Sequence, residues 1–256
     1  NITTNTDVDM EFGTGVVYHC TYGDIEDVKW LEELKIEPIE ILNKDGFLNE
    51  KAGRFKGLHI KKARDAVIKA LEEEGRIAKI EKINHVVNVH ERCETDIEIL
   101  RTDQWYIKYL DLKEDFIEYG RKIRWYPEHM RSRYENWIKG LKWDWNISRQ
   151  RHFGVPIPAW YCARCSAIVI AEEKQLPVDP LVDKPLHKCK CSSNEFVPEK
   201  DVLDTWTTSS LTPDIAIELF KDKPIYKKLF PMSLRPQAHD IITFWLFNTV
   251  VKSYFH

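Results

Sequence analysis

Several features are missing from this sequence of 256 residues. No apolar run approaches the roughly 20 residues that a membrane-spanning helix needs. The opening stretch NITTNTDVDMEFGTG has no basic segment followed by an apolar core, so no secretory signal is visible. Internal repeats and low-complexity tracts are also absent. We therefore expect a cytoplasmic protein with no membrane partner. Because the chain lacks an initial Met and ends on an apolar, helix-like run, we also expect a fragment of a longer protein.

Charge of either sign is nearly balanced, with 38 Lys and Arg against 41 Asp and Glu. The distribution is less even. Between Arg121 and Arg151 there are nine basic and three acidic residues, with tryptophans and tyrosines between them. A basic and aromatic segment is typical of an RNA-facing surface. It is equally typical of a helical hairpin whose long Lys and Arg side chains lie over an aromatic core.

Local patterns predict the main elements. Leu58–Glu74 carries one apolar stripe and is followed by Gly75, which predicts a helix with a glycine at its end. The sequence ILNKDGFLN predicts a hairpin around its Asp-Gly turn. Residues 112–140 are predicted to be helical with a break at Pro127. Strands are predicted in 1–20 and 83–100, and Asp24 is expected to cap a short helix.

Four of the six cysteines form two close pairs, Cys162 with Cys165 and Cys189 with Cys191. Without a secretory signal, paired cysteines indicate metal before disulfides. Zinc prefers four soft ligands in a tetrahedron, and we expect one structural zinc ion here. The second pair is one residue tighter than the usual spacing, so His187 could replace Cys189 or Cys191 as a ligand. A metal-free loop is the alternative.

Five segments resemble one family in the same order. WDWNISRQRHFGVPIPAWYC is similar to the signature of the isoleucine, valine and leucine branch of the class I aminoacyl-tRNA synthetases, with Phe153 where a Trp is usual. DVLDTWTTSSLTP and LRPQAHDIITFW resemble catalytic elements of that branch. EFGTGVVYHCTYGDIEDV and AGRFKGLHIKKARDAVIKALEEEGRI resemble its editing domain. The segments DTWTTSSLTP and LRPQAHD closely resemble the archaeal-type valine enzymes, and residues 240–245 match the D-I-I-x-x-W pattern of their pocket helix.

The resemblance implies an α/β fold. It would combine part of a Rossmann-type catalytic domain, an α+β, β-barrel-like editing insertion and a small zinc module. The implied boundaries are 1–100 for the C-terminal part of the editing domain and 101–150 for the return segment. Residues 151–200 would form the zinc module, and 201–256 would belong to the catalytic domain.

The resemblance also implies an activity. The complete enzyme would activate valine with ATP and Mg²⁺ and transfer it to tRNA(Val), acting as a monomer. Asp240 would pair with the α-ammonium of valine, and Trp206 and Trp245 would wall its side chain against isoleucine. Without the resemblance, core packing explains both tryptophans and a helix cap explains Asp240. Arg149 and Arg151 could face ATP or the tRNA, or pair with Asp144.

A pocket shaped for valine cannot reject threonine by size. Such a pocket rejects threonine only about a hundredfold, so a hydrolytic editing site is needed as well. The resemblance assigns Asp27 to the ammonium of the mischarged amino acid and Asp24 to the threonine hydroxyl, with Gly13-Thr14-Gly15 shaping the pocket floor. Taken alone, the two acids are more typical of a solvated first helical turn, where the helix dipole favours negative charge.

Two ATP-binding motifs of the class, HIGH and KMSKS, are absent from this sequence. The chain alone is therefore not expected to activate valine. Two alternatives remain. One is a part of an isoleucyl-tRNA synthetase, and the other is a non-catalytic zinc-ribbon module that binds RNA.

Overall fold

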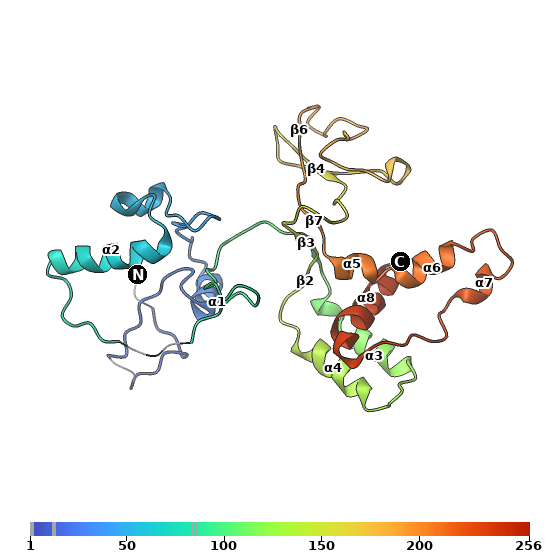
Figure 1. Ribbon diagram of the computed structural model, residues 1–256, viewed down its shortest axis with the longest axis horizontal. Coiled ribbons are helices and arrows are strands. Elements are labelled where there is room, and N and C mark those ends of the chain that lie inside the picture. Colours follow the sequence, from blue (N-terminus) through green and yellow to red (C-terminus); the bar gives the residue numbers. More distant parts are fainter. Residues whose placement is uncertain (1–2, 12–13, 83, 85) are drawn as a thin grey trace. The chain divides into compact units, whose positions relative to one another are not determined.

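The computed structural model describes residues 3–11, 14–82, 84 and 86–256, with the side chain of Ile25 also outside the description. The chain divides into two compact units, Asn1–Thr102 and Asp103–His256 (Figure 1). Each unit has its own elements and its own buried residues. None of the described helices is long and apolar enough to cross a membrane.

The first unit is built from two helices and short turns. Helix α1 is Ile25–Glu33, η1 is a 3₁₀ turn at Glu50–Phe55, and helix α2 is Ile60–Glu73. Helix α2 confirms the predicted helix, and Gly75 follows it at a φ of 64°. The predicted hairpin also forms, because Leu42 and Leu48 are paired and the Gly46 N–H donates to the Asn43 carbonyl.

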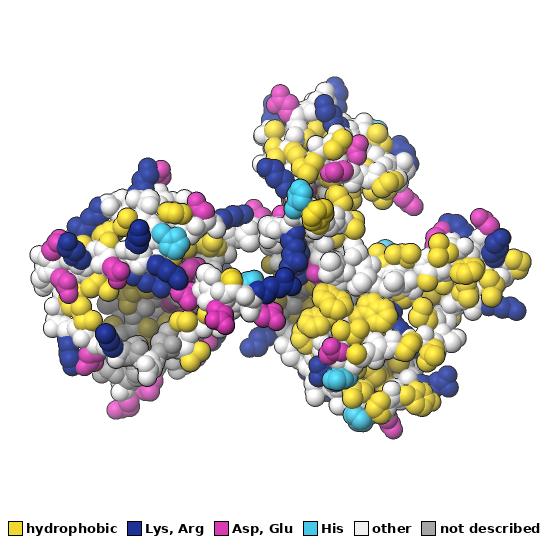
Figure 2. Space-filling model, viewed as in Figure 1, with side chains coloured by type: hydrophobic (Ala, Val, Ile, Leu, Met, Phe, Trp, Pro, Cys, Tyr) yellow, Lys and Arg dark blue, Asp and Glu magenta, His cyan; other side chains and the backbone are white. Residues whose placement is uncertain are grey.

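The strand predictions in this unit are wrong for the described residues. Residues 3–11 and 14–20 contain turns and irregular chain, and the described residues 84 and 86–100 form only the isolated bridge between Val89 and Asp96. A strand needs a continuous partner to pair its backbone groups. No such partner is present among the described residues, so no barrel-like sheet forms in them. Val16, Val86 and other apolar side chains of these segments are exposed. Hydrophobic side chains also appear among the charged ones on the molecular surface in Figure 2.

The second unit holds most of the helices and all the named strands of the described residues. Its helices are α3 Lys113–Lys122, α4 Met130–Gly140, α5 Thr205–Ser209, α6 Thr212–Glu218, α7 Tyr226–Leu229 and α8 Phe247–Phe255. Shorter turns are η2 Leu110–Leu112, η3 Glu173–Gln175, η4 His239–Ile241 and the π-helical turn η5 Ile242–Leu246.

The strands of this unit are short and pair antiparallel. Strand β1 (Tyr106–Ile107) pairs with β2 (Trp145–Asn146), and β3 (Ser148–Arg149) pairs with β7 (Val202–Leu203). A three-stranded sheet has the order β5-β4-β6, with β5 Ile168–Ile170, β4 Ala159–Cys162 and β6 Phe196–Pro198. No parallel pair of a Rossmann-type sheet occurs among the described strands. Residues 201–256 contribute only β7 to the pairing, and the rest of their named elements are helices or helical turns.

An aromatic core joins α3, α4, η5 and α8. Phe116, Tyr134 and Ile138 are fully buried, and Phe116 and Tyr134 pack edge-on against Phe247 with ring centres 5.8 and 6.1 Å apart. The Tyr134 hydroxyl donates to the Phe116 carbonyl at 3.0 Å, which satisfies its polar group inside the core. The basic segment 121–151 therefore begins in the last residues of α3 and includes all of α4, which together form a helical hairpin over an aromatic core with its predicted break at Pro127.

Candidate functional site

The four paired cysteines come together at one end of the three-stranded sheet. Cys162 is the last residue of β4, and Cys165 follows in the turn toward β5. Cys189 and Cys191 lie in the loop before β6. Their four Sγ atoms all lie within 4.8 Å of one another, and the Cys162–Cys191 and Cys165–Cys189 pairs are each 3.5 Å apart. Residues far apart in sequence thus form one cluster of four thiols.

This cluster has the donor set and spacing of a zinc site. Zinc–sulfur bonds of about 2.3 Å in a tetrahedron place the sulfurs just under 4 Å apart. Burial raises the pKa of the Cys162 thiol, but backbone N–H groups of Cys165 and Arg164 and the neighbouring thiols outweigh it and lower that pKa to about 6. The Ala167 backbone N–H lowers the pKa of the Cys165 thiol, but the three other thiols outweigh it and raise that pKa to about 12. This environment thus favours a thiolate at Cys162 and opposes one at Cys165. Metal binding needs deprotonated cysteines, and a bound cation would supply the opposite charge that several neighbouring thiolates require.

His187 is outside this cluster. Its Nε2 lies 2.5 Å from a carboxylate oxygen of Glu172, and its side chain is largely exposed. Four thiols would complete a closed site with no position for a reacting water. The cluster can therefore hold the fold and is not suited to catalysis.

The two candidate pocket tryptophans lie on neighbouring elements. Trp206 is in α5 and stacks on Phe244 of η5, with ring centres 5.5 Å apart and 19° between planes. Trp245, also in η5, donates its indole N–H to the Ser209 carbonyl at 3.1 Å. Trp206 also packs against the aromatic core, so part of its surface has the structural role that packing alone explains.

Asp240 lies in η4, five residues before Trp245. Its side chain is exposed and caps no helix, because Ala238 precedes η4 and Ile241 precedes η5 at the capping positions. The structural alternative of a helix cap is thus not what the fold uses. An exposed carboxylate at this position is free to meet a cation such as an ammonium group.

Arg149 and Arg151 have different surroundings. Arg149 Nη2 lies 3.3 Å from the buried carboxylate of Asp204, and Arg149 Nη1 donates to the Asn146 and Ser148 carbonyls. The predicted ion pair between Arg149 and Asp144 is therefore wrong. Asp144 accepts instead from the backbone N–H groups of Tyr109 and Leu110. Arg151 is exposed and has no ion pair among the described residues.

In the first unit, Asp24 and Asp27 meet at the start of α1. The predicted cap is confirmed, since Asp24 Oδ1 accepts from the Asp27 N–H at 2.9 Å. The Asp27 side chain is only 13% exposed, and its Oδ1 accepts from the Cys20 N–H at 3.2 Å. Of the expected pocket floor, Gly13 lies outside the described residues. Thr14 and Gly15 are described, and Gly15 has a φ of 69°.

Sequence reasoning missed two residues beside Asp27. The His19 Nε2 atom lies 2.8 Å from the Asp27 carbonyl and 3.8 Å from its carboxylate. A Cβ added to Gly23 would lie 2.4 Å from Asp27 Oδ2, so only glycine leaves the carboxylate its place. A single glycine just before an acidic helix start was the available signal. Nothing in the spacing pointed to His19.

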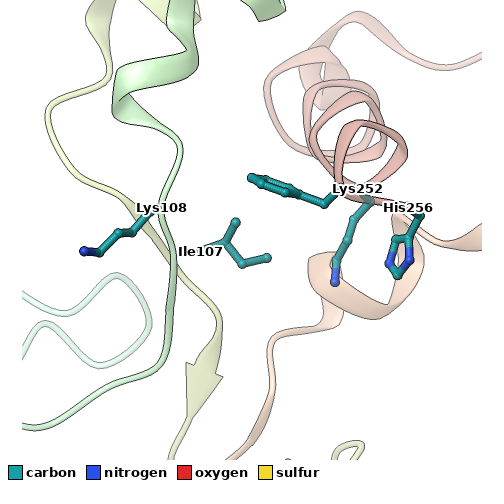
Figure 3. Close-up of a pocket in the computed structure, with 5 residues that line it drawn as sticks. Ile107, Lys108, Lys252 and His256 are labelled. Carbon is teal, nitrogen blue, oxygen red and sulfur yellow. The ribbon is translucent and has the colours of Figure 1, made fainter. Parts of the chain in front are cut away.

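A separate hollow of about 350 Å³ lies between β1 and the end of α8. Ile107 points across it toward the helix, while the Lys108 amine turns away from Lys252 (Figure 3). Burial lowers the pKa of Lys252. The basic groups do not converge on one point, so the hollow does not form a site for a single anion.

Comparison with known proteins identifies the class. The family model for class I tRNA synthetases (I, L, M and V) matches residues 23–255. The chain therefore belongs to the class I tRNA synthetase family.

Within this family, the chain is similar to valine–tRNA ligases of archaea. A valine–tRNA ligase of Thermoplasma acidophilum is 53% identical over 100% of this chain, and one of Thermoplasma volcanium is 50% identical over 97%. A valine–tRNA ligase of Archaeoglobus fulgidus is 48% identical over 96%. These matches cover 32%, 31% and 28% of the relatives, so the chain spans about a third of their length.

Proposed function

We propose that this chain is part of a valine–tRNA ligase. The complete enzyme would activate valine with ATP and Mg²⁺ and transfer it to tRNA(Val) in the cytoplasm, acting as a monomer. The observation that carries this proposal is the 53% identity to a valine–tRNA ligase along the whole chain. The placement of Trp206 and Trp245 on adjoining elements supports it, because a small branched side chain needs flat, bulky walls.

In this proposal the second unit supplies part of the Rossmann-type catalytic domain, from residue 201, and the zinc module, 151–200. Asp240 would pair with the ammonium group of valine. Zn²⁺, held by Cys162, Cys165, Cys189 and Cys191, would cross-link the loops of the module and take no part in the reaction. Residues 101–150 would return the chain from the editing domain, and Arg151 would be free to contact ATP or the tRNA acceptor end.

The synthetic site is tested by ATP–pyrophosphate exchange with the complete enzyme. Valine should support exchange far better than isoleucine, and Asp240→Asn should raise the KM for valine at least tenfold, because a charge-assisted hydrogen bond is lost. The matched control is Asp222→Asn, an exposed acid in another loop, which should leave exchange unchanged. Preference for isoleucine would identify the isoleucine enzyme. RNA binding without any exchange would support the non-catalytic zinc module.

The first unit would hold part of the editing site, with residues 1–100 as its share of the editing domain. Asp27 would pair with the ammonium group of a mischarged threonine, and Asp24 would meet its hydroxyl. The near burial of the Asp27 carboxylate supports a role beyond a solvated helix turn. Asp24 is already engaged as the α1 cap through one oxygen, so only its second oxygen could meet a substrate.

Deacylation of threonyl-tRNA(Val) by the complete enzyme tests this site. Asp27→Ala should abolish deacylation and leave valine-dependent exchange intact. Gly23→Ala should have a similar effect, because its Cβ would displace the Asp27 carboxylate. The control is Glu26→Ala, in the same first turn but exposed. Normal deacylation by Asp27→Ala would refute the assignment.

A further inference from the structure

Trp245 is held by hydrogen bonds at the edge of its ring and by a cation over the ring face. Its indole N–H lies 3.1 Å from the Ser209 carbonyl and 3.3 Å from the Thr212 hydroxyl, at the junction of α5 and α6. The Arg235 guanidinium lies over the ring, 3.9 Å from its centre. The edge and one face of the indole are therefore occupied by this chain, and in the proposed valine pocket the opposite face would meet the ligand.

Arg235 is an unusual partner for that face. It is half-buried in the loop before η4, and its Nε and Nη2 atoms are buried without a hydrogen-bond partner among the described residues. Burial lowers its pKa to about 10, against an opposing effect of the Asp214 charge, so Arg235 stays charged at neutral pH. A buried cation without hydrogen bonds is costly, and its stacking on the indole offsets part of that cost.

A pocket that excludes an amino acid with one extra methylene needs wall side chains that keep their positions. Such exclusion contributes about 10- to 200-fold in discrimination, and it is lost if the wall can move aside. The two hydrogen bonds fix the Trp245 ring at its edge, but they leave it able to tilt about that edge. The guanidinium lies over the ring face and blocks this tilt. The stack thus supplies the one restraint that the hydrogen bonds lack.

We propose that Arg235 is a positioning residue that holds Trp245 and so sets how strongly the enzyme rejects amino acids larger than valine. This inference rests on the proposed function as a valine–tRNA ligase. Arg235 touches the tryptophan and not the substrate. Its removal should therefore act on the ratio between two amino acids and leave the rate with the correct one unchanged.

The test is ATP–pyrophosphate exchange by the complete enzyme with valine and with isoleucine. Arg235→Ala should lower the ratio of kcat/KM for valine over isoleucine about three- to tenfold, the size expected from a partly buried cation–π contact. The kcat for valine should stay within about twofold. Arg235→Lys keeps the charge but not the flat stack, so it should restore part of the ratio.

Two further variants keep the result interpretable. Arg235→Met retains an apolar chain over the indole if Arg235→Ala does not fold, and it should lose part of the discrimination because the flat cationic stack is gone. Lys227→Met removes an exposed cation of α7 and should change nothing. An unchanged ratio in folded Arg235 variants would overturn the inference. So would an equal rise in KM for both amino acids, which would make Arg235 a direct substrate ligand. A wild-type enzyme inactive with valine would instead refute the proposed function.

Discussion

The two units differ in what holds their candidate sites. Among the described residues, the first unit buries only Leu48 and Ala63 as apolar core, whereas the second buries a continuous aromatic cluster. Asp24 and Asp27 are accordingly fixed by contacts within a few residues along the chain. The indole hydrogen bond of Trp245 and the contacts between the cysteine pairs span 24 residues or more. A side chain held by residues close in sequence keeps its position when the packing of the unit changes slightly. A side chain held by residues distant in sequence keeps its position only while that packing is intact.

The largest effect should come from metal removal, which should destabilise the cysteine module and leave the first unit unchanged. Purified protein should contain about one zinc per chain. Chelation should remove a stabilisation on the order of 10 kcal/mol from the module. Hydrogen exchange should then show loss of amide protection in β4, β5 and β6 but not in α2.

Cys189→Ser should abolish zinc binding for the same reason. Its matched control is Cys93→Ser, an exposed cysteine of the first unit, which should leave the zinc content unchanged. Protein that contains no metal before chelation would contradict this account of the cluster.

A core truncation should separate the two units most directly. Phe116→Ala empties a fully buried position and should cost about 3–5 kcal/mol in the free energy of unfolding. Ile68→Ala removes an apolar side chain of α2 that is 41% exposed, so it should cost much less. Urea denaturation followed by circular dichroism measures both. Similar costs would mean that the first unit has a core comparable to the second.

Loss of a cap should sharpen the view that the first site is held locally. Asp24→Ala removes the acceptor for the Asp27 N–H and should destabilise α1 by about 0.5–2 kcal/mol. Asp24→Asn keeps an acceptor oxygen and should restore most of this. Exchange rates of the α1 amides are the measurement. If the α3 and α4 amides changed as well, the restraint would not be local.

The smallest effect should come from an exposed ion pair. Arg64 and Glu98 lie 2.7 Å apart on the first unit, with side chains 57% and 30% exposed. A double-mutant cycle with Arg64→Ala and Glu98→Ala should give an interaction of about 0.2–1 kcal/mol. Raising the salt concentration should reduce it further. A larger, salt-independent value would indicate a network that these two side chains do not form alone.

Structural features that depend only on residues within about 20 positions of one another could be predicted from the sequence. The apolar stripe of α2, the Asp-Gly hairpin, the helix break at Pro127 and the Asp24 cap all depend on neighbours in sequence. The cysteine pairs were visible too, because their residue type is rare and their spacing is short. His187 was weighed as a ligand on spacing alone, and no spacing could show that it pairs with Glu172.

Partners distant in sequence were not predictable. Asp144 was the nearest acid to Arg149, but the fold brings Asp204 there because β3 and β7 pair. The cover that Arg235 gives Trp245 depends on the path of a loop with no regular pattern. The predicted strands of the first unit failed for a related reason. Alternating valines favour an extended backbone. A β-strand forms only where a second strand pairs with its backbone groups.

The pairing of β3 with β7 has one more consequence. Ser148 lies opposite Leu203 and Arg149 opposite Val202, so the chain leaves for the cysteine module and comes back at a single point. Residues 150–201 are thus joined to the rest of the unit beside this strand pair, and a hydrogen bond of 2.7 Å from Trp105 Nε1 to Glu199 Oε2 ties the segment there a second time. Loops of this segment that lie away from the strand pair and from Glu199 can therefore lengthen or shrink without moving the residues on either side. A tight two-residue turn placed between Arg149 and Val202 would connect β3 directly to β7.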